Sequence, residues 1–305
     1  MAINQDKSLE ERILKLKEER NAVIIVHNYQ RGEVQDIADF IGDSLELSQR
    51  AAKTDAAVIV FCGVHFMAET ASILCPDRTV LLPDKNAGCP MADMITAEQL
   101  RQKKKDLPNA TVVTYINSSA EVKAESDFCC TSANGVKVVQ NVDNEEILFV
   151  PDQYLGDYIS RQTGKKMTLW PGYCPTHLRI LPEDIIRRKD EYPQARVVVH
   201  PECRPDVIAL ADETLSTSGI IRYAGREDVS ELIVGTEVEI IYRLSKENPS
   251  KKFIPASKKA VCPNMKLITL EKILNSLETM APEVKVPEEI RIRAKTAVDR
   301  MLEMV

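Results

Sequence analysis

One sequence pattern occurs three times along the chain, and this repeat constrains the fold more than any other feature. Its clearest members are three apolar, β-branched segments that read AVIIVHNYQ, TVVTYINSS and RVVVHPEC. His27, Tyr115 and His200 occupy the same place in these segments and follow one another at nearly equal intervals along the chain. Self-similarity at such a regular spacing predicts three copies of one structural unit.

Residues further along each unit keep the same phase. An aspartate, then a serine or threonine, then the end of an apolar run each recur at a fixed distance from the reference position. A Cys-Pro dipeptide follows in every unit, at a distance that is nearly the same in all three. In chain order these sets are Asp39, Asp127 and Asp212; Ser44, Ser132 and Thr217; Gly63, Pro151 and Thr236; and Cys89, Cys174 and Cys262. We expect the aspartates to be structural, capping or linking adjacent strands.

Each unit is expected to consist of a strand, a helix, a short strand, a helix, a strand, a helix and a fourth strand, followed by a cysteine loop and a helix. Such alternation predicts an α/β fold with parallel strands and right-handed crossovers. We therefore expect three three-layer αβα domains, related by a pseudo-threefold axis, each with a parallel sheet of about four strands. The expected domains are residues 1–107, 108–192 and 193–305. The end segments, 1–20 and about 280–305, should be helices packed on this core.

Local signals predict where several helices begin and end. Ser8 and Glu11 have the spacing of a capping box, and Ser44 and Ser132 stand where a helix N-cap belongs. Gly164 follows a helical segment near residues 154–162, in the position that favours a left-handed C-terminal residue.

Composition and charge restrict the classes of partner. The formal net charge is −6, and no tract rich in lysine and arginine is interleaved with aromatic residues, so nucleic acid is not expected. No apolar run approaches the roughly 20 residues that span a bilayer, and the N-terminal segment has no apolar signal core. We expect a soluble, cytoplasmic protein, in which the eight cysteines stay reduced.

The repeat also predicts a central site. Ligands of open parallel sheets bind beyond the carboxyl ends of the strands. His27, Tyr115 and His200 end the first strand of each unit, and side chains two residues later point to the same side. If the three strand ends converge, one cavity receives these residues together with Tyr29, Asn117, Glu202, Ser44, Ser132, Thr217 and the three cysteines of the Cys-Pro dipeptides.

Three converging thiolates indicate a particular kind of metal centre. A closed zinc site needs four ligands, whereas three cysteines suit a [4Fe–4S] cluster with one iron free of protein ligands. We therefore predict that Cys89, Cys174 and Cys262 bind one such cluster per chain. The remaining cysteines are expected to be buried structural residues, and this includes Cys203, although it follows Glu202 at the rim of the predicted cavity. His177, three residues after Cys174, is a candidate for a hydrogen bond that supports the metal site.

At these residues the chain resembles the quinolinate synthase A family. The resemblance covers nearly the whole sequence and is specific only when the motifs are taken together. They are HNYQ (27–30), DIADFIGDS (36–44), GVHFMAET (63–70), CPMAD (89–93), YINSSAEVKA (115–124), TSAN (131–134), CPTH (174–177), HPEC (200–203), STSG (216–219), GTE (235–237) and CPNMK (262–266).

The resemblance implies an activity that the spacing alone does not. Iminoaspartate would condense with dihydroxyacetone phosphate, with loss of phosphate and two waters, to give quinolinate for NAD biosynthesis. It also implies the three-domain fold and the three-cysteine [4Fe–4S] cluster. Whether iminoaspartate arrives by diffusion or through transient contact with the enzyme that produces it stays open.

The resemblance further implies roles for individual residues. Glu202 would act as acid or base, and His27 and Tyr29 would orient and protonate the fragment derived from the triose phosphate. His200 would contact the same ligand, and Tyr115 would gate the site or stack on the forming ring. Asn117, Ser132 and Thr217 would bind carboxylates, and Ser44 the phosphate. One departure is that Cys262 lacks the CxxCxxC context of some family members.

Three other functions fit parts of the same pattern. A different [4Fe–4S] hydro-lyase would use the same open iron, without a triose phosphate. A mononuclear metal hydrolase would use His27, His200 and Glu202. An iron–sulfur sensor or cluster carrier would need no cavity lined with histidine, tyrosine and glutamate.

Overall fold

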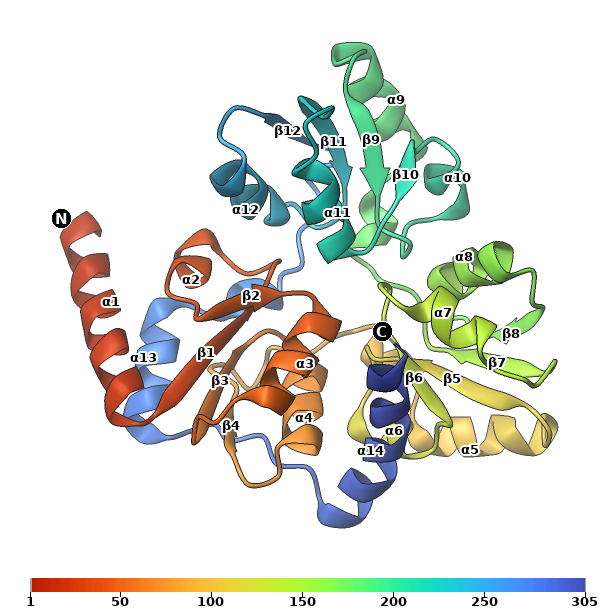
Figure 1. Ribbon diagram of the computed structural model, residues 1–305, viewed down its shortest axis with the longest axis horizontal. Helices are drawn as coiled ribbons and strands as arrows, with labels where there is room; N and C mark the ends of the chain where they lie inside the picture. The colour runs from red at the N-terminus through yellow and green to blue at the C-terminus, as the bar shows by residue number, and fades with distance from the viewer. Residues whose placement is uncertain (1, 305) are drawn as a thin grey trace.

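Three similar α/β units surround a common centre (Figure 1). The computed structural model describes the backbone of residues 2–304 and the side chains of residues 8–304. Within that range lie three four-stranded sheets, all parallel, with strand orders β2-β1-β3-β4, β6-β5-β7-β8 and β10-β9-β11-β12. The identical order in each sheet confirms the threefold α/β repeat predicted from the sequence.

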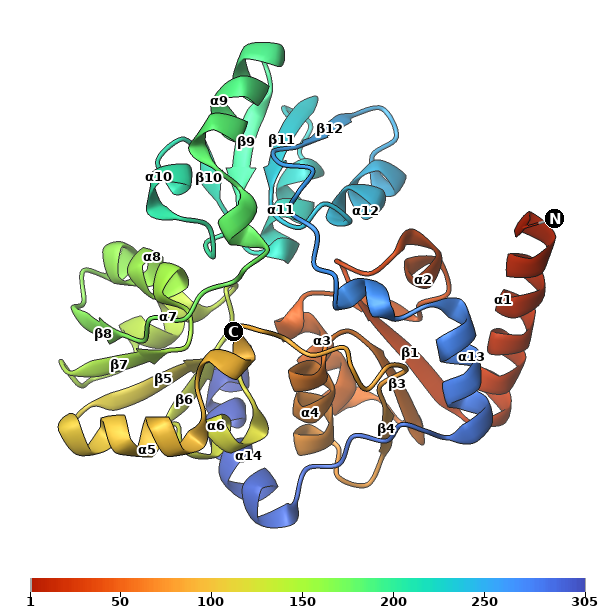
Figure 2. The same ribbon diagram turned by 180° about the vertical axis from the view of Figure 1, so that it is seen from behind.

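The strands are short, and their carboxyl ends face the centre of the molecule (Figures 1 and 2). Their bounds are β1 Ala22–His27, β2 Phe40–Gly42, β3 Val58–Cys62 and β4 Thr79–Leu81; β5 Thr111–Tyr115, β6 Phe128–Cys130, β7 Ile147–Val150 and β8 Met167–Leu169; β9 Arg196–Val199, β10 Glu213–Thr214, β11 Glu231–Gly235 and β12 Lys252–Pro255. The central strands are apolar and β-branched because helices cover both of their faces, as in other parallel sheets.

Helices connect successive strands within each unit, and single-turn 3-10 helices follow the cysteine loops. The connecting helices are α2 Gly32–Asp36, α3 Ser44–Lys53, α4 His65–Leu74, α6 Ala120–Ala124, α7 Gly135–Gln140, α8 Gln153–Thr163, α10 Pro205–Ile208, α11 Thr217–Ala224 and α12 Ile240–Glu247. The 3-10 helices are η1 Ala92–Met94, η2 His177–Arg179 and η3 Met265–Leu267.

The helix after each cysteine loop covers the next sheet around the axis. These helices are α5 Ala97–Asp106, α9 Pro182–Glu191 and α13 Leu270–Thr279. Leu100 of α5 is buried with the second sheet, Ile185 of α9 with the third, and α13 packs on α1 and β3 of the first. The chain therefore crosses from one unit to the next at each Cys-Pro dipeptide, which brings these loops to the centre.

Helices at both ends of the chain pack on this core, as predicted (Figure 2). α1 (Ala2–Glu19) lies beside α13, and α14 (Glu288–Glu303) packs against α6 and β6 of the second unit. None of the described helices is both long and apolar enough to cross a membrane.

The in-phase aspartates make the same bond in every unit. Oδ2 of Asp39 accepts the backbone N–H of Ile24 at 2.8 Å. Asp127 and Asp212 accept the equivalent N–H groups of β5 and β9 at 2.8 and 2.6 Å. Each carboxylate thus links the loop before a short edge strand to the central strand, which confirms the expected structural role.

Helix ends differ from prediction at three places. α1 already begins at Ala2, so Ser8 lies inside the helix and the predicted capping box is wrong. Asp43, not Ser44, caps α3, because its side chain accepts the N–H groups of Leu45 and Glu46. Ser132 is likewise two residues before the N-cap of α7. Gly164 ends α8 in the left-handed region, with φ of 72°, as predicted.

Candidate active site

A cavity of about 190 Å³ lies where the carboxyl ends of the three sheets meet. Its lining comes from all three units. The structure brings together there all twelve residues singled out in the sequence: His27, Tyr29, Ser44, Cys89, Tyr115, Asn117, Ser132, Cys174, His200, Glu202, Thr217 and Cys262. The chemical roles assigned to them stay predictions.

The strand ends of the first and third units form the same turn. Nδ1 of His27 accepts the N–H of Tyr29 at 3.2 Å, and Nδ1 of His200 accepts the N–H of Glu202 at 3.3 Å. Burial lowers the pKa of His27 to about 3, with a further decrease from Lys266 and an opposing effect of Glu202. The neutral ring of His27 therefore accepts through Nδ1 and presents Nε2–H as a donor to the cavity.

The same burial lowers the pKa of His200 to about 3, against an opposing effect of Glu202. Nε2 of His200 lies 3.1 Å from the hydroxyl of Ser132, in the second unit. Ser132 and Thr217 are not helix caps, because Asn134 is the N-cap of α7 and Ser216 is that of α11. Their hydroxyls can therefore interact across unit boundaries. The Thr217 hydroxyl lies 3.0 Å from that of Tyr29.

A continuous chain of polar contacts crosses the floor of the cavity. Tyr115 donates its hydroxyl to Oε1 of Glu202 at 2.5 Å. Oε2 of Glu202 lies 2.7 Å from Nδ1 of His177, an ion-pair contact rather than a well-aligned hydrogen bond. Nε2 of His177 lies 2.8 Å from the Thr236 hydroxyl, which lies 2.5 Å from that of Tyr29. This series of contacts joins Tyr29 of the first unit to Tyr115 of the second. The residues between them are His177, in the loop of Cys174, and Glu202 and Thr236 of the third unit.

Within this series of contacts, Glu202 is charged and the two tyrosines are neutral. Burial raises the pKa of Glu202, but the imidazoles of His177 and His200 and the hydroxyl of Tyr115 lower it by more, so that it lies below its usual range. Burial, and then the charge of Glu202, raise the pKa values of Tyr29 and Tyr115 well above 10. The series of contacts therefore contains one carboxylate and has at each end a neutral phenol that can donate a proton.

The sequence does not predict that Thr236 and His177 belong to this series of polar contacts. The sequence marks Thr236 only as a member of the repeat, in phase with Gly63 and Pro151, and His177 only as a candidate near a metal ligand. Both side chains are 2% exposed. The phase of Thr236 was the available signal, because the position follows the third strand of its unit and so also lies at the central edge of the sheet.

Each cysteine of the three Cys-Pro dipeptides begins the same small turn. Backbone N–H groups of the turn that follows favour its thiolate form and act to lower its pKa, always including the N–H of the residue three positions later. These groups belong to Ala92 and Met91 for Cys89, to His177 for Cys174, and to Met265 and Asn264 for Cys262. All three are free thiols with partial exposure, whereas the other five cysteines are buried.

This arrangement fits an iron–sulfur cluster. Burial raises the pKa of the Cys89 thiol to about 12, and the amide donors oppose that rise because they favour the thiolate. Thiolate ligands with hydrogen bonds to sulfur are typical of such centres. Three equivalent turns facing one cavity therefore supply the donor set that a three-cysteine cluster requires.

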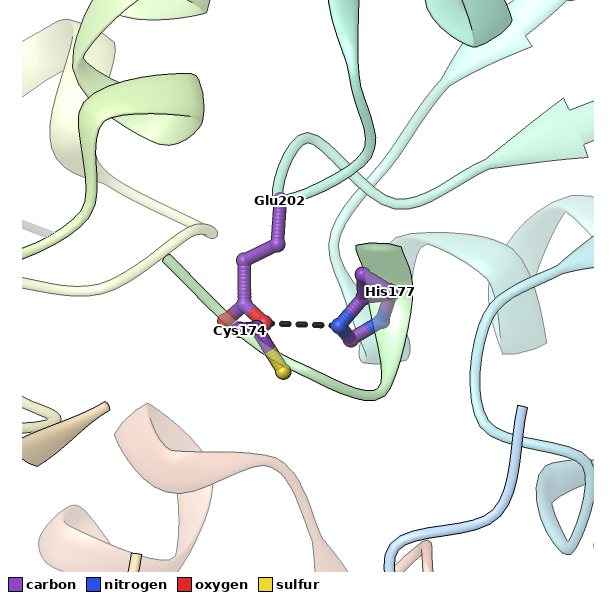
Figure 3. A group of neighbouring side chains, drawn as sticks. All are labelled: Cys174, His177 and Glu202. Carbon is purple, nitrogen blue, oxygen red and sulfur yellow. Dashed lines mark ion pairs between the residues drawn. The ribbon is translucent and has the colours of Figure 1, made fainter. Parts of the chain in front are cut away.

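A different group of ligand atoms is also close together. One ligand atom each from Cys174, His177 and Glu202 lies within 4.8 Å of the others (Figure 3). The nitrogen and oxygen of the last two are only 2.7 Å apart. Two ligands of one zinc ion, each about 2.1 Å from the metal in a tetrahedral site, would lie about 3.4 Å apart. The contact therefore fits a direct ion pair better than a shared metal ion.

The comparisons with known proteins identify the family. A protein-family model described as quinolinate synthetase A protein matches residues 11–303. The chain belongs to the quinolinate synthase A family. A quinolinate synthase of Dehalococcoides mccartyi is 62% identical over 294 residues, which are 96% of this chain and 97% of the relative.

Relatives from other organisms are similar over comparable lengths. A quinolinate synthase of Geotalea uraniireducens is 61% identical over 284 residues, 93% of each chain. Quinolinate synthase 2 of Methanosarcina acetivorans is 57% identical over 300 residues, 98% of this chain and 97% of the relative. Quinolinate synthases of this family carry a [4Fe–4S] cluster on three cysteine ligands. The three equivalent cysteine turns are the matching feature of this chain.

Proposed function

We propose that this chain is a quinolinate synthase of NAD biosynthesis, which condenses iminoaspartate with dihydroxyacetone phosphate and releases phosphate and two waters. Its family membership supports the overall reaction. The observation that most supports this chemistry is that three equivalent cysteine turns share one cavity with Glu202, two tyrosines and two strand-end histidines.

Cys89, Cys174 and Cys262 are the proposed cluster ligands. When bound, the cluster would supply one iron without a protein ligand, a Lewis acid for a carboxylate or hydroxyl of the substrate. The amide groups of the three turns would stabilise the thiolate form of each ligand. Cys75 and the other buried cysteines do not line the cavity and would remain structural.

Glu202 is the proposed acid–base residue. It is 3% exposed and accepts a hydrogen bond from Tyr115, and its second oxygen contacts His177. As a carboxylate it can take a proton from carbon or nitrogen of the substrate, and Tyr115 or His177 can return one. Rearrangement of the triose and the two dehydrations require such proton movements in both directions.

Tyr29 is the proposed proton donor on the opposite side of the cavity. Its hydroxyl contacts both Thr217 and Thr236, and through Thr236 it reaches His177. A proton lost by Tyr29 could therefore be replaced along this chain. His27 and His200, neutral and donating through Nε2, would orient the substrate by hydrogen bonds to its oxygens.

Neutral donors would bind the anionic groups of both substrates. Asn117, Ser132 and Thr217 are proposed for carboxylates. Ser44 is proposed for the phosphate, because it lines the cavity at the N-terminus of α3, where the helix dipole favours anions. We propose that Tyr115, which ends β5 two residues before Asn117, gates the cavity or stacks on the forming ring.

An anaerobic assay tests the overall reaction. Reconstituted protein is given dihydroxyacetone phosphate and iminoaspartate generated in the assay, and quinolinate and phosphate are quantified together. Equimolar quinolinate and phosphate are expected, and neither should form when one substrate is left out. Phosphate release without quinolinate would instead support another type of lyase. Iron-free, zinc-containing protein with full activity would support the hydrolase alternative.

Three further assignments remain proposals. The repeats 1–107, 108–192 and 193–305 are proposed as the three domains, although packing places the helix after each cysteine loop on the next sheet. Reaction in the cytoplasm is proposed from membership of the quinolinate synthase A family. Delivery of iminoaspartate by transient contact with its producing enzyme is proposed as testable by co-purification.

A further inference from the structure

A buried carboxylate lies directly behind the loop of Cys262. Glu237, which follows β11, is fully buried. Its Oε1 accepts the backbone N–H of Cys262 at 3.1 Å and lies 3.1 Å from Nζ of Lys266. Its Oε2 accepts the N–H of Glu239 at 2.9 Å. Two backbone donors and an ammonium group thus satisfy this carboxylate, and one of those donors belongs to a proposed cluster ligand.

Lys266 connects this carboxylate to the first unit. Its side chain is 14% exposed, and besides Glu237 its ammonium lies 3.5 Å from Glu239. The same ammonium donates a hydrogen bond to the backbone carbonyl of Tyr29. The carbonyl of Lys266 in turn accepts from Nε of Arg31 at 3.0 Å. One residue therefore contacts both the support of Cys262 and the strand-end turn that carries Tyr29.

Other contacts dock the same segment onto the first unit. Nδ2 of Asn264 donates to the carbonyl of Gly88 at 2.8 Å, immediately before Cys89. The amide of Gln30 contacts the sulfur of Met265 at 3.4 Å. Figure 2 shows this part of the chain, in blue, passing from β12 to α13 beside the first unit. The loop of Cys262 thus lies between two units and has no sheet of its own to hold it.

The position of this loop therefore depends on a few polar contacts. A buried carboxylate and a partly buried ammonium are costly unless they remain paired and hydrogen-bonded. The pair is stable only when the Cys262 N–H, Lys266 and the Tyr29 carbonyl are all in place. Cys262 and Lys266 belong to one loop, whereas Glu237 follows β11 and Tyr29 follows β1, so the pair favours one relative arrangement of these three segments.

We propose that Glu237 and Lys266 form a positioning pair, which holds Cys262 at the cluster site and keeps the turn of Tyr29 in register with it. This inference rests on the proposed cluster ligands. Glu237 lines the cavity, and the proposal gives both residues a positioning role rather than a proton-transfer role. Removal of either should loosen the third ligand and displace Tyr29, while the fold stays intact.

The test compares single substitutions in reconstituted full-length protein. Lys266→Met removes the ammonium, and Glu237→Gln removes the charge but keeps an oxygen near Cys262. Lys266→Arg is the conservative variant. Lys272→Met is the matched control: Lys272 pairs with Asp84 at 2.5 Å and donates to the carbonyl of Leu267 at 2.7 Å, but it contacts neither Cys262 nor Tyr29.

The first readout is the rate at which an iron chelator removes iron under anaerobic conditions. We expect Lys266→Met to release iron about 10-fold faster or more, as outer contacts of metal ligands commonly contribute that much. Glu237→Gln should be intermediate, and Lys266→Arg and Lys272→Met close to wild type. The double variant Lys266→Met/Glu237→Gln should release iron no faster than Lys266→Met, because the two residues act as one unit.

The second readout is kcat per bound cluster. We expect kcat of Lys266→Met to fall while KM changes little, because Tyr29 is displaced and the anion-binding hydroxyls are not. Wild-type iron-release rates in both Lys266→Met and Glu237→Gln would overturn the proposal. If Lys266→Met fails to fold, the comparison of Glu237→Gln with Lys272→Met decides in the same way.

The ligand assignment itself can fail separately. Wild-type protein that loads no cluster, or a Cys262→Ser variant that keeps it as firmly as wild type, would contradict the proposed ligands. Normal loading of wild type, together with unchanged iron release in the two variants, would contradict only the positioning pair.

Discussion

The hydroxyl of Tyr115 lies 2.5 Å from Oε1 of Glu202, although 87 residues separate them in the chain. Tyr115 ends the first strand of the second unit, and Glu202 follows the equivalent strand of the third. The contact requires two units to be placed accurately against each other. It also leaves Glu202 as a carboxylate that already has one proton donor in reach, the state needed to start a proton transfer.

Glu202→Gln should abolish turnover without removing the cluster. The amide keeps the size of the side chain but can neither take nor return a proton, so we expect kcat to fall by about 10²–10⁴-fold. Quinolinate formation at saturating substrate measures this loss, and the visible absorption of the protein reports the cluster. Glu213→Gln, on the exposed edge strand β10, is the control and should keep full activity. Retained activity in Glu202→Gln would remove its assigned role.

Thr236→Val should interrupt the path between Tyr29 and His177. Valine keeps the branched shape at this buried position but has no hydroxyl, so both neighbours lose a partner. We expect kcat to decrease about 100-fold, the lower end of an acid–base contribution. Thermal stability should also fall, because an unpaired buried polar group costs about 1–3 kcal/mol.

Thr236→Ser is the matched control for this change. It retains the hydroxyl and loses one methyl group, so kcat should stay within a few-fold of wild type. Steady-state kinetics of the two variants, measured at equal cluster content, separate the hydroxyl from the packing. Equal activity of the serine and valine variants would show that no proton passes through this position.

The architecture and the location of the site follow from the sequence because the repeat converts distances along the chain into positions in space. Asp39 illustrates this: its phase matches two other aspartates, and all three bind a central-strand N–H in the same way. Cys89, Cys174 and Cys262 converge for the same reason, since each follows the last strand of its unit.

Contacts between units are not encoded by the repeat phase. His177 and Thr236 meet because two different units are packed at a certain angle, and no local pattern specifies that angle. The choice between neighbouring helix-capping residues is likewise not predicted by the sequence. Ser44 and Asp43 are both good capping residues, and only the backbone geometry decides that Asp43 caps while the Ser44 side chain faces the cavity.

Glu125 should stabilise the docking of the C-terminal helix in a pH-dependent manner. Its carboxylate lies 2.9 Å from Arg101 of α5 and 2.7 Å from Arg293 of α14. Burial raises its pKa, but the two arginines lower it by more, so the net direction is down. Because the folded chain favours the carboxylate more than the unfolded chain does, the stabilisation is complete above the unfolded value of about 4.3 and disappears as pH falls through the lowered folded pKa.

Glu125→Gln should therefore lower Tm by about 2–4 °C at pH 7, and the difference from wild type should shrink as the pH falls below about 4.3. Differential scanning fluorimetry across that range measures it. Glu98→Gln is the control: Glu98 also pairs with Arg101, but its side chain is 74% exposed, and such surface pairs contribute little. A wild-type advantage that grows on acidification would contradict the assigned direction.

Replacing any one of Cys89, Cys174 and Cys262 by serine should remove the cluster and the activity together. A serine hydroxyl is a poor substitute for the thiolate, and two remaining cysteines leave the cubane with too few protein ligands. Anaerobic reconstitution followed by iron and sulfide analysis measures the loss for each variant. Cys75→Ser is the matched control, because this buried cysteine only donates to a backbone carbonyl, at 3.1 Å, away from the cavity. Wild-type iron and sulfide content in any of the three variants would exclude that residue as a ligand, and a colourless preparation with full activity would exclude the cluster.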